Sequence, residues 1–199
     1  MIDSYFTIKG ASQGEYSEKR SKFLAFAHHV ETPDEVKTLV NRYEREYYDA
    51  RHVCYAYVLG HLREDFRAVD NGEPSGTAGK PILGQLNKHE LTDALIVVVR
   101  YFGGIKLGTS GLQQAYKQAA LEAIANAETE ERTVDKVITV SFEYPLMNEV
   151  MRVVKEISPR IIKQDFQIQC RLILQIRMGE AQRLTERLKQ IRGVETGID

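Results

Sequence analysis

The 199 residues are enough for one domain or two small ones, and 43% of them are hydrophobic, so a modest core can form. The 27 lysine and arginine residues are balanced by 28 acidic residues, and the resulting net charge of -1 excludes a protein that is basic all over its surface. Any contact with nucleic acid would therefore be a local patch. No apolar run approaches the roughly 18 residues of a membrane span, and no signal-peptide pattern follows Met1.

The cysteines and histidines indicate neither a disulfide framework nor a metal centre. Cys54 and Cys170 lie far apart and form no CxxC pattern, so we expect reduced, buried thiols, as in a cytoplasmic protein. His28, His29 and His61 do not have the spacing of metal ligands. The sequence therefore predicts no bound metal.

Residues 5–30 alternate between apolar and polar side chains, which predicts two or three strands, with Phe23, Ala25 and Ala27 on one face of the last. The basic run at 18–22, which contains Arg20, is either a solvated turn, as composition favours, or part of a site. A helix is then predicted to begin after Thr32, with Pro33 at its first position and Glu35 at its third, the pattern of a capping box. Its expected buried stripe is Val36, Leu39, Val40, Tyr43 and Tyr47.

Residues 51–60 carry apolar side chains on both faces and predict an interior strand. Arg51 and His52 are polar residues at the start of this buried element, which is typical of a site, although a structural hydrogen bond is the commoner role for such a histidine. The next segment, residues 70–81, is too rich in glycine and proline for regular structure throughout. Asn71-Gly72 predicts a turn.

Two sets of polar side chains in the segment 70–81 have alternative roles. Ser75 and Thr77 are both candidate N-caps for a helix that continues through residues 82–86. Asp70 and Glu73 could hold Mg²⁺ or act as acid and base, but bonding to the N–H groups of their own turn is the favoured role.

The segment 95–116 is the centre of the pattern, because a buried strand ending at Arg100–Phe102 runs into a glycine-rich basic loop and then a helix. The loop contains Gly103-Gly104 and Lys106. Helix N–H groups and the positive end of the helix dipole would face one point there, which suits an anion, whereas the alternative is that the glycines only allow close packing. The helix should bury Leu112, Tyr116, Ala119, Ala120, Ala123, Ile124 and Ala127.

A polar stretch, residues 128–133, predicts a boundary between a domain at 1–131 and another at 132–199. Beyond it the pattern is βαββαβ: strands at 136–144, 161–168, 170–178 and 194–198, with helices near 146–157 and 181–191. The overall class is therefore α+β, with a ferredoxin-like second domain.

The two motifs DNGEPSGTAGKP, at 70–81, and VVRYFGGIKLG, at 98–108, resemble those of the IMPACT family, also called the YigZ family. The segment 18–23 and the Arg51-His52 strand fit in order and spacing, so the resemblance spans the chain. It implies a left-handed βαβ sandwich similar to domain IV of elongation factor G, followed by a ferredoxin-like domain similar to domain V. It also implies a link to translation. We expect no cofactor. Eukaryotic relatives use an additional RWD domain that this chain does not carry, so their regulatory activity is not transferred.

One departure from the family concerns the loop and the helix that follows it. Family members usually have glycine and arginine where this chain has Ser110 and Gln114. Ser110 is a good candidate cap, whereas the missing arginine removes a bidentate phosphate donor. Lys80, Arg100 and Lys106 would then carry more of the charge.

The leading interpretation is a non-catalytic protein that contacts structured RNA or the ribosome in translation, with a protein partner in translation control as a further expectation. The alternative is a Mg²⁺-dependent enzyme acting on a phosphorylated ligand or nucleotide, and a third reading is a protein-binding regulator whose motifs only build the fold. Arg100 could also form a buried pair with Asp70 or Glu73. Tyr101 and Phe102 are either stacking or core residues. The expected binding residues are Arg20, Arg51, Lys80, Arg100, Tyr101, Gly103, Gly104, Lys106, Gly108 and Ser110.

Overall fold

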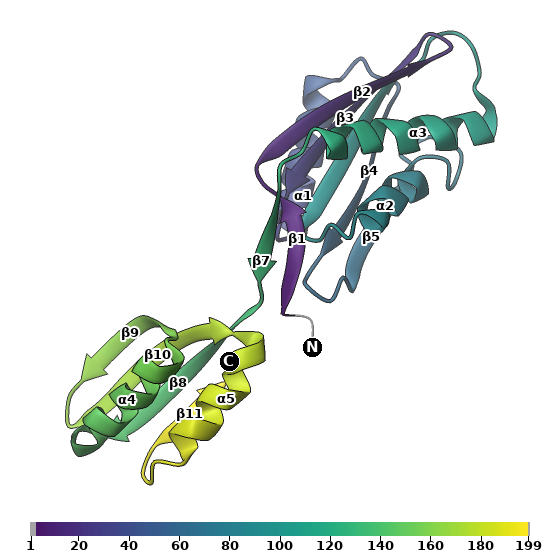
Figure 1. Cartoon of the computed structure of the whole chain (residues 1–199). Coiled ribbons are helices and arrows are strands. Elements are labelled where there is room, and N and C mark those ends of the chain that lie inside the picture. The colour runs from purple at the N-terminus through teal and green to yellow at the C-terminus, as the bar shows by residue number, and fades with distance from the viewer. Residues whose placement is uncertain (1–2, 199) are drawn as a thin grey trace. The chain divides into compact units, whose positions relative to one another are not determined.

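The computed structural model describes residues 3–198 and divides the chain into two units (Figure 1). One contains residues 5–132, and the other contains residues 133–198 together with residues 3–4. Asp3 is tied to the second unit by an ion pair with Arg177, 2.8 Å long, although the sequence placed it in the first domain. The described helices include none that is long and apolar enough to cross a membrane.

The first unit is built on an antiparallel sheet in the order β2-β3-β6-β4-β5. Its strands are β2 (Ala11–Glu18), β3 (Ser21–His29), β4 (His52–Leu59), β5 (Asp65–Val69) and β6 (Ala94–Tyr101). Since β3 and β4 both run antiparallel to β6, they are parallel to each other, and the helix α1 (Pro33–Glu46) connects them. A βαβ unit of this kind, with a third strand inserted, is the arrangement that the resemblance implied.

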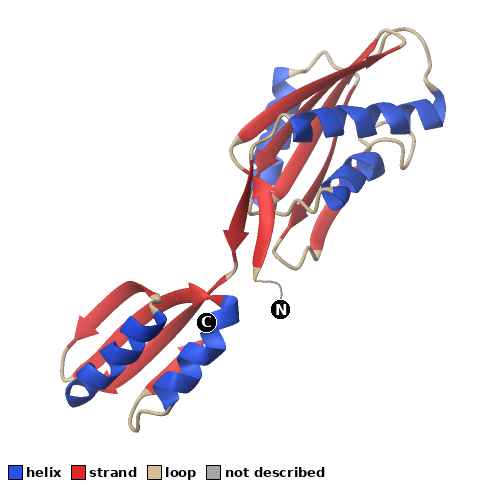
Figure 2. Ribbon diagram, in the orientation of Figure 1, coloured by secondary structure: helices blue, strands red, loops and turns tan. Residues whose placement is uncertain are grey.

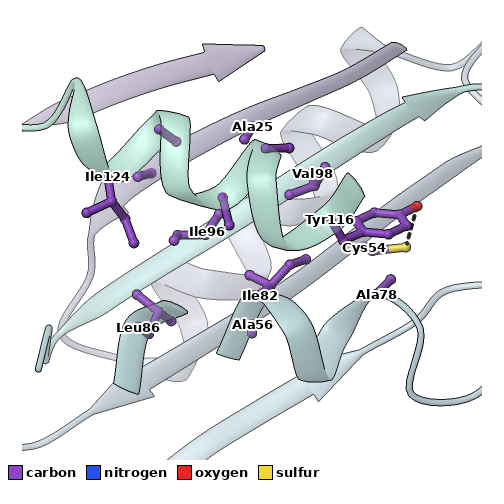
Figure 3. Close-up of a cluster of buried hydrophobic side chains, with 14 of the residues drawn as sticks. Ala25, Cys54, Ala56, Ala78, Ile82, Leu86, Ile96, Val98, Tyr116 and Ile124 are labelled. Atoms are coloured by element: carbon purple, nitrogen blue, oxygen red, sulfur yellow. Dashed lines mark hydrogen bonds between the residues drawn. The ribbon is translucent and has the colours of Figure 1, made fainter. Parts of the chain in front are cut away.

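The central strand β6 is apolar on both faces because both faces are covered. Leu95, Val97 and Val99 pack in the cluster beneath α1. Ile96 and Val98 face the opposite side, where α2 (Gly79–Lys88) and α3 (Gly108–Ala125) lie (Figures 1 and 3). Alternation along one strand thus supplies two cores.

The predicted start of α1 is confirmed in detail. The Glu35 N–H donates to Thr32 Oγ1 and the Thr32 N–H donates to Glu35 Oε2, each over 3.3 Å, with Pro33 at the first helical position. These reciprocal bonds satisfy N–H groups that the helix itself leaves free. Val36, Val40 and Tyr43 are buried, as the stripe predicted.

The predicted caps of the other two helices are wrong. The N-cap of α2 is Ala78, and the Thr77 hydroxyl instead donates to Pro74 O over 2.6 Å. The N-cap of α3 is Leu107, and Ser110 lies inside the first turn without capping it. Ser75 is not a cap either. Hydrogen-bond donors at the start of α2 are satisfied by a side chain distant in sequence, as described below.

The boundary segment forms a strand, β7 (Thr129–Thr133), paired with β1 (Ser4–Ile8). The second unit then has the predicted βαββαβ order and a sheet in the order β11-β8-β10-β9 (Figure 1, with the helices and strands coloured in Figure 2). Its elements are β8 (Asp135–Glu143), a short turn of 3₁₀ helix (Tyr144–Leu146), α4 (Met147–Ile157), β9 (Arg160–Phe166), β10 (Gln169–Arg177), α5 (Met178–Lys189) and β11 (Glu195–Ile198). Both helices cover one sheet face, where alternate residues of β10 such as Leu172 and Leu174 are fully buried.

Candidate anion-binding cavity

A cavity of about 480 Å³ opens where four segments of the first unit meet. These are the start of β4, the turn before α2, the end of β6 and the start of α3. The lining residues are Arg51, His52, Glu73, Pro74, Arg100, Phe102, Lys106, Leu107, Gly108, Thr109 and Leu112. Two motifs that are about 30 residues apart in sequence therefore share one site.

Sheet register places three of the site's side chains in one row. Phe23 of β3 is opposite Arg100 of β6, and Arg100 is opposite His52 of β4. Residues directly opposite each other on neighbouring strands point to the same face of a sheet. The row lies on the face that α2 and α3 cover, since Phe23 belongs to their core cluster.

The floor of the cavity contains a buried ion pair between Arg100 and Glu73. Arg100 Nη1 lies 2.6 Å from Glu73 Oε1, and the two residues are 5% and 9% exposed. The Tyr116 hydroxyl donates to the same oxygen over 2.9 Å. The sequence had left open whether Arg100 binds an anion or pairs with a neighbouring carboxylate, and in the structure it pairs with Glu73.

Two aromatic rings hold the Arg100 guanidinium. Its central carbon lies 5.4 Å from the ring centroid of Phe23 and 5.7 Å from that of Phe102. Phe23 also packs edge-on against Tyr116, with centroids 5.1 Å apart. Arg100 Nε is buried and has no hydrogen-bond partner among residues 3–198.

Tyr116 and Cys54 close the back of the network, and neither is a nucleophile. Cys54 Sγ lies 3.4 Å from Tyr116 Oη (Figure 3). It also lies 2.8 Å from Asp70 O. Burial raises the pKa of Cys54 to about 12, so the thiol stays protonated at neutral pH. Burial and the neighbouring Cys54 also raise the pKa of Tyr116.

Asp70 orders the turn that delivers Glu73. Its Oδ1 accepts hydrogen bonds from the N–H groups of Ala78 and Gly79, over 2.9 and 2.8 Å, and its Oδ2 accepts one from Gly76 over 2.7 Å. Partial burial raises the pKa of Asp70, but the three hydrogen bonds outweigh this and hold it below its usual range. The favoured role of Asp70 in its own turn is therefore the observed one, and it supplies the cap of α2 from eight residues away.

His52 faces the ion pair with one nitrogen and the turn with the other. Its Nδ1 lies 3.0 Å from Asn71 O, and its Nε2 lies 3.8 Å from Glu73 Oε1. Because a carbonyl oxygen can only accept, Nδ1 carries a proton and donates it to Asn71 O. Nε2 faces the Glu73 carboxylate.

The rim of the cavity is cationic. Arg51 and Lys106 are exposed, and neither side chain makes an ion pair in the described part of the chain. The α3 helix begins two residues after Lys106, at Gly108, whose φ of 75° favours glycine, and no side chain caps its first turn. Free helix N–H groups and two cations at one opening can bind an anion.

Several expected binding residues lie away from this cavity. Lys80 and Ser110 line a groove between α2 and α3, together with Gln114. The absence of an arginine at 114 therefore does not weaken the cavity described here. Tyr101 follows Arg100 in the strand and so points to the opposite face, where its hydroxyl donates to Asp49 over 2.9 Å.

Gly103 packs closely against the backbone of the turn that contains Arg20. Arg20 occupies the turn between β2 and β3, and a Cβ on Gly103 would collide with the backbone of Arg20 and Ser21. The Gly103 N–H donates to Ser21 Oγ over 3.1 Å. Gly104 is different, since its φ is 85° and its missing Cβ faces open space.

Sequence reasoning did not assign Tyr116 or the apolar wall residues Leu107 and Leu112 to the site. Tyr116 was placed in the buried stripe of its helix, which is correct, but its hydroxyl needs a partner there. The requirement that a buried tyrosine hydroxyl be hydrogen-bonded was the signal that could have linked it to Glu73.

Comparison with known proteins supports the resemblance noted from the motifs. Residues 19–124, more than half of the chain, match the family model described as the Impact N-terminal domain. The chain belongs to the IMPACT family. The IMPACT family member YvyE of Bacillus subtilis is 36% identical over 78% of this chain and 72% of its own length. An IMPACT family member of Haemophilus influenzae is 33% identical over 86% of this chain and 84% of its own.

A solved structure supports the arrangement of the fold across both units of this IMPACT family member. The crystal structure of a hypothetical protein aligns over 98% of this chain and 97% of its own, with 28% sequence identity and a TM-score of 0.74. The mixed α and β architecture with two domains is therefore shared with a known structure.

Proposed function

We propose that this protein is a translation-associated binding protein that contacts structured RNA or the ribosome through the rim of the cavity. The observation that carries the proposal is the meeting of Arg51, Lys106 and the uncapped start of α3 at one opening. Contacts to the RNA backbone require such donors, and they position a protein on RNA without reading its sequence.

The proposal gives the phosphate contacts to a smaller set of residues than the sequence analysis did. Arg100 is paired with Glu73, so it shapes the floor rather than offering a free charge. Two exposed cations and a helix terminus favour few phosphate contacts, and the net charge of -1 adds little long-range attraction. We therefore expect modest affinity and a shallow dependence on salt.

The link to translation rests on the family resemblance, in which the two domains are similar to domains IV and V of elongation factor G. The βαββαβ order of the second unit is consistent with that comparison. A ribosomal target would be recognised through RNA shape and backbone, which fits a rim that offers cations and backbone N–H groups.

A Mg²⁺-dependent enzyme has less support from the same site. Both Asp70 oxygens accept hydrogen bonds from the turn, and Glu73 Oε1 is bound to Arg100 and Tyr116. No group of three or more His, Cys, Asp or Glu residues within residues 3–198 could hold a metal ion. The carboxylates that would bind Mg²⁺ are thus engaged in the fold.

The test compares two double variants in binding to ribosomal RNA fragments and ribosomal subunits across a salt series. Arg51→Ala with Lys106→Ala removes the rim cations, whereas Lys37→Ala with Arg45→Ala removes the same charge from exposed positions on α1, across the sheet. We expect the rim variant to bind at least tenfold more weakly and its salt slope to fall by about 1.4, the effect of two lost phosphate contacts. The α1 variant should bind nearly as the wild type does.

Three outcomes would count against the proposal. An absence of RNA and ribosome binding at low salt would exclude it. An equal loss in both double variants would show only a net-charge effect. Subunit binding that neither variant weakens would indicate a contact elsewhere, such as a protein partner.

A further inference from the structure

We infer that the strand β9 pairs with β9 of a second copy of this chain, and that the protein forms a weak symmetric dimer in this way. The two second units then share one continuous sheet, with Gln164 of each copy opposite Gln164 of the other. This surface belongs to the second unit, so it goes beyond the RNA contact proposed for the first.

The strand β9 is an open edge of its sheet. It stands at the end of the order β11-β8-β10-β9, and among the described strands it pairs only with β10 (Figure 1). All seven of its residues, Arg160–Phe166, are exposed. Alternate N–H and C=O groups of an edge strand point away from the neighbouring strand, so they are free to bind a further one.

The exposed side chains of this edge include large apolar ones. They lie along β9 and in the turn after it: Ile161, Ile162, Phe166 and Ile168. Ile162 is 51% exposed and Phe166 is 42% exposed. Exposed apolar side chains that gather at one place indicate a surface that binds another protein.

The geometry of antiparallel pairing limits how β9 can meet its own copy. Two residues that lie opposite each other either both direct their N–H and C=O groups toward the partner strand or both direct them away. Because this direction alternates along a strand, the sequence positions of two opposite residues must differ by an even number. A symmetric pair of identical strands is therefore centred on one residue, which lies opposite its own copy.

Charge selects that central residue. A pair centred on Lys163 or on Asp165 places like charges directly opposite each other, which destabilises a sheet. A pair centred on Gln164 places Lys163 of each strand opposite Asp165 of the other. Neither charged side chain makes an ion pair within residues 3–198, so both are available to a second copy.

The same register matches the apolar side chains. Phe166 lies opposite Cys170 of β10, which is buried beneath the helices, so Phe166 points to that face of the sheet. Alternation along the strand brings Gln164 and Ile162 to the same side. With Gln164 at the centre, Ile162 of each copy lies opposite Phe166 of the other, and an aromatic residue opposite a β-branched one stabilises a pair of strands.

Two features of β9 that usually oppose pairing act here as a restriction on the partner. Edge strands commonly carry a lysine or a bulge, which keeps other chains away. The bulge of β9 is at Ile162 and leaves the segment 163–166 regular, and Lys163 is accommodated only where the partner strand supplies an opposite charge. A strand of seven residues buries little surface, so we expect the dimer to be weak and reversible.

The experiment measures the mass of the full chain by sedimentation equilibrium, from low micromolar to several hundred micromolar protein. We expect the mass to rise from 22.7 kDa at the lowest concentration toward twice that value at the highest. Lys163→Glu places like charges opposite each other at two places in the symmetric interface, so the dissociation constant of the dimer should rise at least tenfold. Asp165→Lys should act in the same direction.

The decisive variant exchanges the two charges. Lys163→Glu combined with Asp165→Lys places opposite charges across the interface again, so it should recover the dimerisation that each single variant loses. Lys189→Glu is the matched control, because Lys189 is exposed on α5 and is followed by β11 at the opposite edge of the sheet. It should dimerise as the wild type does, and circular dichroism checks that every variant is folded.

Three results would overturn the inference. The first is a mass that stays at 22.7 kDa at every concentration. The second is a dimer that Lys163→Glu weakens no more than Lys189→Glu does, and the third is a dimer that the exchanged variant does not recover. None of these results bears on the RNA contact, because Arg51 and Lys106 lie in the first unit, so the two proposals can fail separately.

Discussion

The two units of this chain bury different kinds of side chain. In the second unit, the one polar side chain that is buried among the described residues is Thr185, whose hydroxyl donates to Ala181 O of its own helix over 2.8 Å. The first unit buries Glu73 and Arg100, along with His28 and Asp93. Burying charge costs free energy unless each charge is well paired. The second unit is therefore specified by its apolar pattern. The first unit also buries a charged network, which the packing of its apolar core does not require.

The buried polar groups also indicate which unit can carry a functional site. Buried charges next to a cavity are frequent at functional sites. The network of the first unit lines such a cavity, while the buried hydroxyl of Thr185 in the second unit bonds within its own helix. We therefore assign the candidate function to the first unit.

The largest expected effect comes from breaking the buried ion pair. Arg100→Met keeps much of the side-chain volume between Phe23 and Phe102 but leaves Glu73 buried without its partner. Loss of one member of a buried pair typically destabilises a protein by about 3–5 kcal/mol. We expect the first unit to unfold at a lower urea concentration, followed by near-ultraviolet circular dichroism of its tyrosines.

Thr185→Val in the second unit is the control for this prediction. It also removes a buried polar group at nearly constant volume, but the group makes one neutral hydrogen bond within its helix. Its expected cost is about 1 kcal/mol. A cost for Arg100→Met as small as that of Thr185→Val would show that the charged network contributes little to the fold, and would remove the contrast between the units.

Much of the fold could be predicted because its signals are local. The capping box of α1 needs only Thr32, Pro33 and Glu35, and the alternation in β10 alone places its apolar residues on one face. The cap of α2 could not be predicted by the same rules. Its donors are satisfied by Asp70, eight and nine residues earlier, and that distance is set by the path of the turn rather than by helix propensity.

The site was predicted in part for a similar reason. The motif at 98–108 contains Arg100, Lys106 and Gly108, and the structure brings them to one cavity with Arg51 from the predicted strand at 51–60. Sequence reasoning could have excluded Tyr101 from the same site as Arg100, since neighbouring residues in a strand point to opposite faces of the sheet. The position of Lys80 depends instead on the direction of α2, which only the folded chain defines.

We expect glycine to be required for different reasons at the two positions that follow β6. A methyl group on Gly103 would collide with the backbone of the β2–β3 turn, so we expect Gly103→Ala to destabilise the first unit by about 3 kcal/mol. Gly104→Ala meets open space, and its cost should be the left-handed backbone conformation alone, about 1–2 kcal/mol. Urea unfolding of both variants measures the difference. Equal costs would mean that close packing at Gly103 is not what requires glycine.

The smallest effect concerns Asp70 and depends on pH. Its pKa is lowered in the folded protein, so its contribution to stability is present above the unfolded value near 4 and is lost as pH falls through the lower folded value. Asp70→Asn should be less stable than the wild type at pH 7, and its stability should fall less steeply below pH of about 4. Urea midpoints of the first unit, taken between neutral pH and acid, measure this.

The control for Asp70 is Asp165→Asn, an exposed aspartate on β9 whose side chain makes no hydrogen bond or ion pair with another described residue. It should leave the acid profile of the first unit unchanged. If Asp70→Asn also leaves that profile unchanged, the three N–H groups of the turn do not depend on a charged acceptor. The contribution of buried charge to the stability of the first unit would then come from Glu73 and Arg100 alone, and the difference between the two units would rest on that pair.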